Sequence, residues 1–135
     1  MDLAKIMAIS AAGMKAQTTR MRVVAENLAN ADALPDKPGA DPYRRKIVTF
    51  ESVLDEARGV ETVAVNRIGF DRSSFGRRYD PGHPGADKDG FVKLPNVKGL
   101  IEMMDLRAAQ RSYEANLSVI QISKAMVQNA MQILA

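Results

Sequence analysis

The fold is decided by the C-terminal segment, residues 96–135, which reads NVKGLIEMMDLRAAQRSYEANLSVIQISKAMVQNAMQILA. The residues from Val97 to Ala135 contain no proline, and their only glycine, Gly99, lies near the start. Apolar residues recur here at alternating steps of three and four, which is the spacing of one face of an α-helix. The pattern predicts a single helix of about 36 residues, more than about 50 Å long.

Two apolar stripes run along this expected helix. From the first stripe we expect seven residues to pack against an N-terminal helix, namely Leu106, Tyr113, Leu117, Ile120, Val127, Met131 and Leu134. From the second stripe we expect five residues to face other subunits, namely Ile101, Val119, Ile122, Met126 and Ile133. A helix with two apolar faces needs cover on two sides, and one partner helix covers only one of them. An exposed apolar strip of this length predicts association with other chains.

The alternative is that the middle of the chain folds back over the second stripe. We favour this less, because residues 35–95 are too polar to supply a matching apolar face.

A second helix is predicted near the N-terminus, over residues 3–30, about 40 Å long. Its apolar seam consists of Leu3, Met7, Met14, Met21, Val24 and Leu28, with Ser10 and Gln17 as polar members. No proline precedes Pro35, so nothing interrupts the helix before its predicted end. We expect Asn27 and Asn30 to close it through capping and surface hydrogen bonds, because asparagine tolerates the left-handed conformation that ends helices.

The middle of the chain, residues 35–95, predicts loops and strands rather than long helices. Residues 35–42 are rich in proline and predict a loop, while residues 43–50, 60–71 and 91–94 have strand character. Residues 51–58 predict a short helical turn that ends at Gly59, and residues 72–78 predict a turn. The sequence therefore predicts an α+β fold, in which long terminal helices pair as a coiled-coil-like stalk and carry a small β-rich lobe between them. The expected parts are residues 1–34, 35–95 and 96–135.

Charge and composition exclude several classes of function. Lys and Arg exceed Asp and Glu by one residue in each of the segments 1–34, 35–95 and 96–135, so the net charge of +3 is evenly spread. A nucleic-acid binder concentrates its positive charge on one face. The one basic run, Arg44-Arg45-Lys46, is short, and we interpret it as a strand edge or lobe surface rather than a phosphate site.

The sequence contains few of the residue types that catalytic and metal sites use. The chain has no cysteine and a single histidine, His83, which lies in the Pro/Gly-rich stretch Tyr79–Gly90. Asp87 and Asp89 resemble part of a calcium loop, but the twelfth position of that loop holds Lys98 instead of glutamate. We interpret the stretch as a rigid connector with a capped aspartate. We expect no catalytic, cofactor or metal site.

No membrane span or cleaved leader is expected. The longest stretches without charge, residues 6–14 and 125–135, are far shorter than the ~20 residues of a spanning helix.

Several motifs carry a resemblance to a known family. They are Asn27-Leu28-Ala29-Asn30-Ala31, Pro42-Tyr43-Arg44-Arg45, Tyr79-Asp80-Pro81-Gly82-His83-Pro84, Gly90-Phe91-Val92, Leu94-Pro95-Asn96-Val97 and Arg111-Ser112-Tyr113-Glu114-Ala115-Asn116. By these motifs the chain resembles the bacterial flagellar axial proteins, and most closely a rod protein of the basal body's proximal rod. The Pro/Asp-rich stretch 32–41 argues against the distal-rod and hook members.

The resemblance implies a structural role without enzymatic activity or cofactor. Its members pair their terminal helices into an inner tube, which transmits torque and forms the export channel. Implied partners are further copies of the chain, the rod proteins FlgB, FlgF, FlgG and FliE, the flagellar type III export apparatus and the MS-ring surroundings. The implied location is the basal-body rod in the periplasmic space, and we expect Asn27, Asn30 and Asn116 to serve packing or assembly. Two alternatives stay open: another self-assembling axial or type III-secreted helical protein, and a basic nucleic-acid binder.

Overall fold

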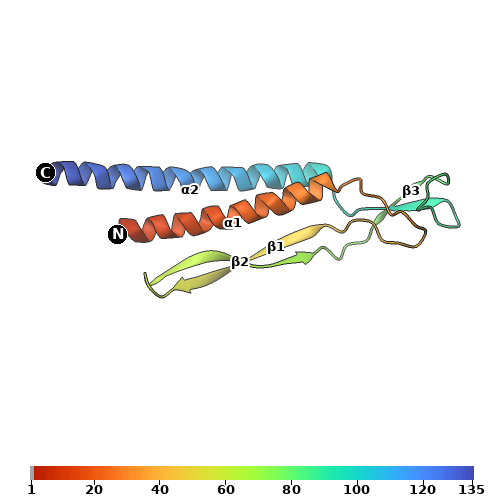
Figure 1. Cartoon of the computed structure of the whole chain (residues 1–135), viewed down its shortest axis with the longest axis horizontal. Helices are drawn as coiled ribbons and strands as arrows, with labels where there is room; N and C mark the ends of the chain where they lie inside the picture. Colours follow the sequence, from red (N-terminus) through yellow and green to blue (C-terminus); the bar gives the residue numbers. More distant parts are fainter. Residues whose placement is uncertain (1) are drawn as a thin grey trace. The chain divides into compact units, whose positions relative to one another are not determined.

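The structure is a computed structural model that describes residues 2–135, and it has two long helices separated by four strands (Figure 1). In chain order the elements are α1 (Leu3–Ala29), β1 (Lys46–Asp55), β2 (Val60–Phe70), β3 (Gly76–Tyr79), β4 (Phe91–Leu94) and α2 (Gly99–Leu134). The strands form two separate two-stranded sheets, β1–β2 and β3–β4. The predicted α+β class is confirmed, and α2 has 36 residues.

Side chains define both ends of α1. The carboxylate of Asp2 accepts a hydrogen bond from the backbone N–H of Ala4 at 2.9 Å, which caps the first turn. At the other end the Asn30 amide donates to the carbonyl oxygen of Glu26 at 2.8 Å. No residue other than glycine has a positive φ in the described part of the chain. The prediction of a left-handed asparagine is therefore wrong, because the Asn30 side chain satisfies the carbonyl that a left-handed turn would otherwise satisfy.

The predicted helical turn at residues 51–58 is also wrong. Strand β1 continues to Asp55, and a turn over residues 56–59 leads directly into β2. The backbone N–H of Gly59, which has a φ of 65°, donates to the Asp55 carbonyl at 2.7 Å. Pairing with β2 outweighs the local helix preference, and it includes a hydrogen bond from the Thr62 hydroxyl to the Val53 carbonyl at 3.2 Å. The turn predicted at residues 72–78 is shorter than expected, because Gly76–Tyr79 forms β3.

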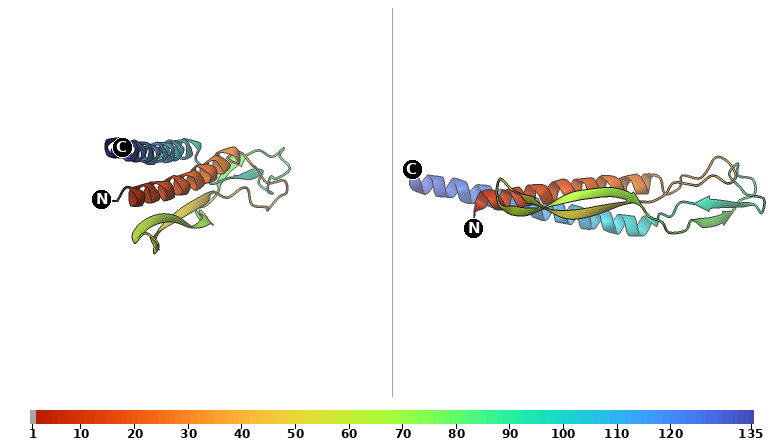
Figure 2. Two further views of the ribbon diagram at one scale, coloured as in Figure 1. Left: turned by 60° about the vertical axis from the view of Figure 1, so that its left-hand side comes forward. Right: turned by 90° about the horizontal axis from the view of Figure 1, so that it is seen from below.

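The chain divides into two compact units. The first comprises the chain up to Met21 together with Val48–Arg67 and Arg107–Ala135. Within it, α1 lies between α2 and the β1–β2 hairpin (Figures 1 and 2). A Cβ on Gly13 of α1 would lie 2.8 Å from the Asn116 amide nitrogen of α2, so the two helices approach closely there. The hairpin covers α1 and leaves the second stripe of α2 in this unit exposed.

The second unit comprises Arg22–Ile47 and Ile68–Leu106. Its antiparallel β3–β4 hairpin pairs Tyr79 with Phe91, whose rings meet edge to face at a centroid distance of 5.4 Å. In the connecting loop the Asp87 carboxylate accepts hydrogen bonds from the backbone N–H groups of Asp89 and Phe91, each at 2.9 Å. The predicted capped aspartate is thereby confirmed.

Candidate assembly interface

The side chains of the last turns of α2, residues 124–134, are all exposed. Of the first stripe, Tyr113, Leu117 and Ile120 are half-buried, whereas Val127, Met131 and Leu134 are exposed. In this unit α2 continues past the N-terminal end of α1, which leaves no neighbouring helix beside its last turns (Figure 1). All second-stripe residues are exposed, namely Ile101 at the start of α2 and Val119, Ile122, Met126 and Ile133 further along. An apolar helix surface of this size is typical of an interface.

The deepest contact line of α2 in the first unit consists of small and polar residues. Ala109 and Ser123 are buried there, and Asn116 between them is half-buried, all spaced seven residues apart. On α1, Ser10 and Ala16 are buried and Gly13 approaches Asn116. Sequence reasoning included Ser10 and Asn116 but missed the other members of this line, because it followed large apolar side chains. The signal that would have found it is the repeat of small residues at heptad spacing, which permits close approach of two helices.

The predicted packing residues of α1 lie on its covered side. Val24 is buried, and Leu3, Met7, Met14, Met21 and Leu28 are half-buried.

Asn27 is not the surface capping residue that the sequence suggested. Its side chain is only 1% exposed, because it binds another segment of the second unit. The Asn27 amide donates to the carbonyl of Lys46 and accepts from the N–H of Lys46, both at 2.9 Å. It also accepts from the Tyr43 hydroxyl at 2.8 Å and donates to the Glu102 carboxylate at 3.3 Å. Asn27 therefore joins the end of α1 to the start of β1 and to α2.

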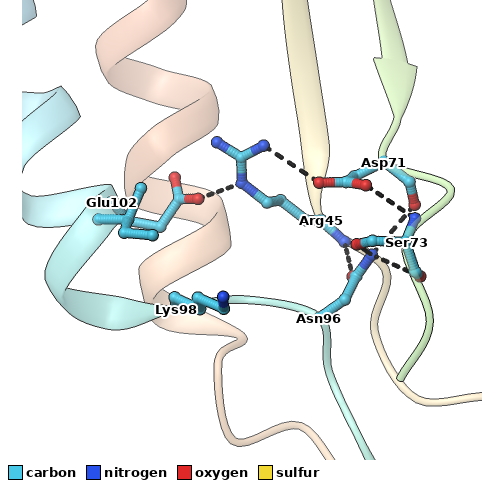
Figure 3. Close-up of a pocket in the computed structure, with 7 residues that line it drawn as sticks. Arg45, Asp71, Ser73, Asn96, Lys98 and Glu102 are labelled. Atoms are coloured by element: carbon cyan, nitrogen blue, oxygen red, sulfur yellow. Dashed lines mark hydrogen bonds and ion pairs between the residues drawn. The ribbon is translucent and has the colours of Figure 1, made fainter. Parts of the chain in front are cut away.

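Arg45 extends this network toward Glu102 and Asp71. Its guanidinium donates to the carboxylate of Glu102, which is 0% exposed, and lies 3.4 Å from the carboxylate of Asp71 (Figure 3). Its backbone N–H donates to the Asn96 side chain at 2.7 Å, and the Asn96 amide in turn donates to the Asp71 carbonyl at 3.0 Å. These groups line a pocket of about 310 Å³. A buried carboxylate is tolerated here because its charge is paired and hydrogen-bonded.

The charges of the network shift the pKa values of its members. Burial lowers the pKa of Arg45, but hydrogen bonds and attraction to Glu102 and Asp71 raise it by more. Hydrogen bonds from the backbone and hydroxyl of Ser73, together with the Arg45 guanidinium, hold the pKa of Asp71 below its usual range. The ion pair of Lys46 with Glu26, at 2.9 Å, raises the pKa of Lys46 and lowers that of Glu26.

The side chains of the basic run, residues 44–46, all bind groups within the second unit. Arg44 donates to the carbonyl oxygens of Asp71 and Ser73, and its guanidinium lies 4.2 Å from the centre of the Phe75 ring. Arg44, Arg45 and Lys46 are all half-buried, Lys46 begins β1, and the three side chains bind partners within the second unit. This arrangement leaves little of the run to bind phosphate.

The first turn of α2 has an inverted pattern of burial. Glu102 points inward, whereas four large apolar residues around it are exposed, namely Leu100, Ile101, Met103 and Met104. An isolated protein normally buries such side chains and exposes the charge. The inversion leaves a second exposed apolar surface at the start of α2.

The described residues contain no group of three or more metal-ligating side chains and no helix long and apolar enough to cross a membrane.

Comparisons with known proteins point to one family. Residues 88–133 match the family model described as "Flagellar basal body rod FlgEFG protein C-terminal". The chain is 53% identical to the flagellar basal-body rod protein FlgC of Agrobacterium fabrum, over 93% of this chain and 91% of that protein. It is 40% identical to the Salmonella typhimurium FlgC, with 94% of each chain covered, and 39% identical to that of Bacillus subtilis, with 93% covered. The chain belongs to the FlgC family of flagellar basal-body rod proteins and is a structural subunit, not an enzyme.

Proposed function

We propose that the exposed apolar surface of α2 is the surface through which this chain joins neighbouring subunits of the rod. The observation that carries the proposal is the exposure of large apolar side chains along the end of α2. Met131, Ile133 and Leu134 are each at least 65% exposed. Fully burying one such side chain contributes about 1.5–3 kcal/mol. Neighbouring helices that cover the stripe would therefore stabilise both the assembly and the helix end itself.

Folding of the helix end is coupled to assembly in this proposal. The free subunit leaves the end of α2 without a partner, and a helix end without tertiary cover is marginal in water. Export before complete folding fits such a subunit. The ordering of the helix end then takes place at the growing tip of the rod, where apolar burial offsets its entropic cost.

We place the subunit in the proximal rod, in the periplasmic part of the basal body. Its proposed neighbours are further copies of the chain, the rod proteins FlgB, FlgF, FlgG and FliE, the export apparatus and the surroundings of the MS ring. The terminal helices would form the inner tube that transmits torque and encloses the export channel. Support for this placement comes from the family membership and from the motifs shared with proximal-rod proteins.

Electron microscopy of basal bodies from a strain that lacks this chain tests the proposed role. We expect basal bodies that stop at the membrane ring, and complete rods when the wild-type chain is supplied from a plasmid. Complete rods and hooks in the strain that lacks the chain would contradict the proposal.

A further inference from the structure

The tip of the β1–β2 hairpin is acidic and partly apolar. Residues 51–61 contain four carboxylates, those of Glu51, Asp55, Glu56 and Glu61, and one cation, Arg58. Arg58 is already bound to Asp55 at 2.8 Å. Within the described chain, Glu51 and Glu56 form no ion pair, and Glu61 accepts only the Ser52 hydroxyl at 3.3 Å. We call residues 51–61 the acidic hairpin tip.

Two apolar side chains accompany these carboxylates. Val53 and Leu54 are exposed, although they are neighbours in a strand and so point to opposite faces. Both faces of the hairpin tip are therefore exposed at these two positions, and both apolar and anionic side chains are accessible to a partner.

The β3–β4 hairpin has the complementary character. Its register places Arg77 opposite Lys93 and Tyr79 opposite Phe91, and these four side chains share one face because their positions alternate by two. Tyr79 is 65% exposed, and Phe91 is exposed as well. We call these four residues the basic β3–β4 face.

Only one of the two cations on the basic face has a counter-charge among the described residues. Like charges directly opposite each other destabilise a pair of strands. Lys93 is paired with Asp41 at 3.1 Å, but Arg77 has no ion pair within the described residues. A further anion beside Arg77 would relieve the repulsion. Exposed tyrosine and arginine side chains are also the residue types that contribute most to protein interfaces.

We infer that the acidic hairpin tip of one copy of this chain binds the basic β3–β4 face of a second copy. This inference rests on the proposed assembly role. The tip supplies unpaired carboxylates beside Val53 and Leu54, and the face supplies Arg77 beside two exposed aromatic rings. Because the two surfaces differ, each copy can give a tip and receive one. Contacts of this head-to-tail kind generate rings or open helical assemblies.

Site-specific cross-linking tests the contact in assembled rods. The chain has no cysteine, so single cysteines introduced at chosen positions are the only thiols in it. Glu56→Cys is placed in one tagged copy and Arg77→Cys in a second copy with a different tag. Both are expressed in a strain that lacks the wild-type chain, and purified basal bodies are treated with a short bis-maleimide cross-linker. We expect a product that carries both tags.

Matched variants define the background. Asn66→Cys lies on β2 outside the tip and is exposed, so its pairing with Arg77→Cys measures chance proximity. Each cysteine variant expressed alone measures contacts between identical positions. A product with both tags at several times the Asn66 level supports the inference. Assembled rods without that excess, or a product that joins Arg77→Cys to a different protein, would overturn it.

A charge swap gives an independent measure of the same contact. Glu51→Lys, Glu56→Lys and Glu61→Lys together should reduce swimming severalfold. Arg77→Glu with Lys93→Glu in the same chain should restore it. Failure of the swap to restore swimming would contradict the contact between copies. Rods that assemble without the cross-link would reject this contact alone and leave the role of α2 intact.

Discussion

The two ends of α2 differ in which side chains they bury and which they expose. At its start, Glu102 is fully buried and held by Arg45 and Asn27, while large apolar residues around it face outward. At its end, Met131 and Leu134 are exposed, and the unit that contains them offers no partner. Hydrogen bonds and ion pairs are directional and fix one arrangement, whereas apolar burial is non-directional and can be supplied by a neighbour. The comparison shows that a polar network fixes the start of α2 within its own unit, whereas the end of α2 leaves apolar side chains exposed, and we propose that neighbouring subunits cover them.

The largest effect is expected on the exposed second stripe of α2, from Ile122→Asp. A charge at this exposed apolar position should prevent burial by neighbours, so swimming and rod assembly should be lost. The free subunit should lose less than about 0.5 kcal/mol of stability, because the side chain is 57% exposed.

The control is Gln121→Asp, which adds the same charge at an exposed polar position on the same helix turn. Rod assembly is scored by electron microscopy of purified basal bodies, and stability by urea denaturation. Normal swimming of the Ile122→Asp strain would contradict the proposal that the second stripe contacts neighbouring subunits.

At the start of α2 the expected effect is on stability. Glu102→Leu should cost about 3 kcal/mol, because it leaves the half-buried Arg45 guanidinium without its main partner. Adding Arg45→Met should recover part of that loss, because an apolar pair can replace a buried ion pair. Urea denaturation of the two single variants and the double variant measures the coupling. Strictly additive losses would show that the ion pair does not anchor the helix.

Two glycines of the loop between β3 and β4 test how tightly the second unit is packed. A Cβ on Gly85 would clash with the backbone carbonyl oxygen of Pro35, so Gly85→Ala should cost about 2 kcal/mol. Beyond its two chain neighbours, Gly82 has no atom within 4 Å of such a Cβ, so Gly82→Ala should change stability little. Urea denaturation compares the two variants. Equal stability of both would contradict the close packing of this loop.

The smallest effect is the acid sensitivity of the second unit. The pKa of Asp71 is lowered in the folded chain, so its charged form stabilises the fold above its ordinary pKa near 3.8. This contribution is lost as the pH falls through that region and then through the lower folded pKa. Urea denaturation at a series of pH values should show stability falling below about pH 4. Asp71→Asn should flatten that fall, and an unchanged pH profile would exclude Asp71 as its source.

The fold class and the long helices could be predicted because their signals are local. The periodicity of the last forty or so residues and the absence of proline there define α2 without knowledge of the rest of the chain. The helical turn predicted at residues 51–58 failed because strand pairing with β2 is a tertiary effect that local preference does not contain.

The polar network could not be derived from spacing. Asn27, Tyr43, Arg45 and Asn96 come from three separate motifs and meet only in three dimensions. Asn27 alone suited a capping role and Arg45 a surface role. Glu102 lies among apolar residues in the sequence, and nothing in that pattern indicates that its carboxylate is buried. Those motifs did indicate the family. In the structure their side chains link the end of α1 to the starts of β1 and α2 through hydrogen bonds and ion pairs.

Hydrogen–deuterium exchange along α2 tests the central claim most directly. In the free subunit, we expect the amides of residues 102–113 to be protected and those of residues 124–134 to exchange much faster, because only the former lie beside covered helix turns. In purified rods both segments should be protected. Equal protection of both segments in the free subunit would contradict the claim that the end of α2 is completed by its neighbours.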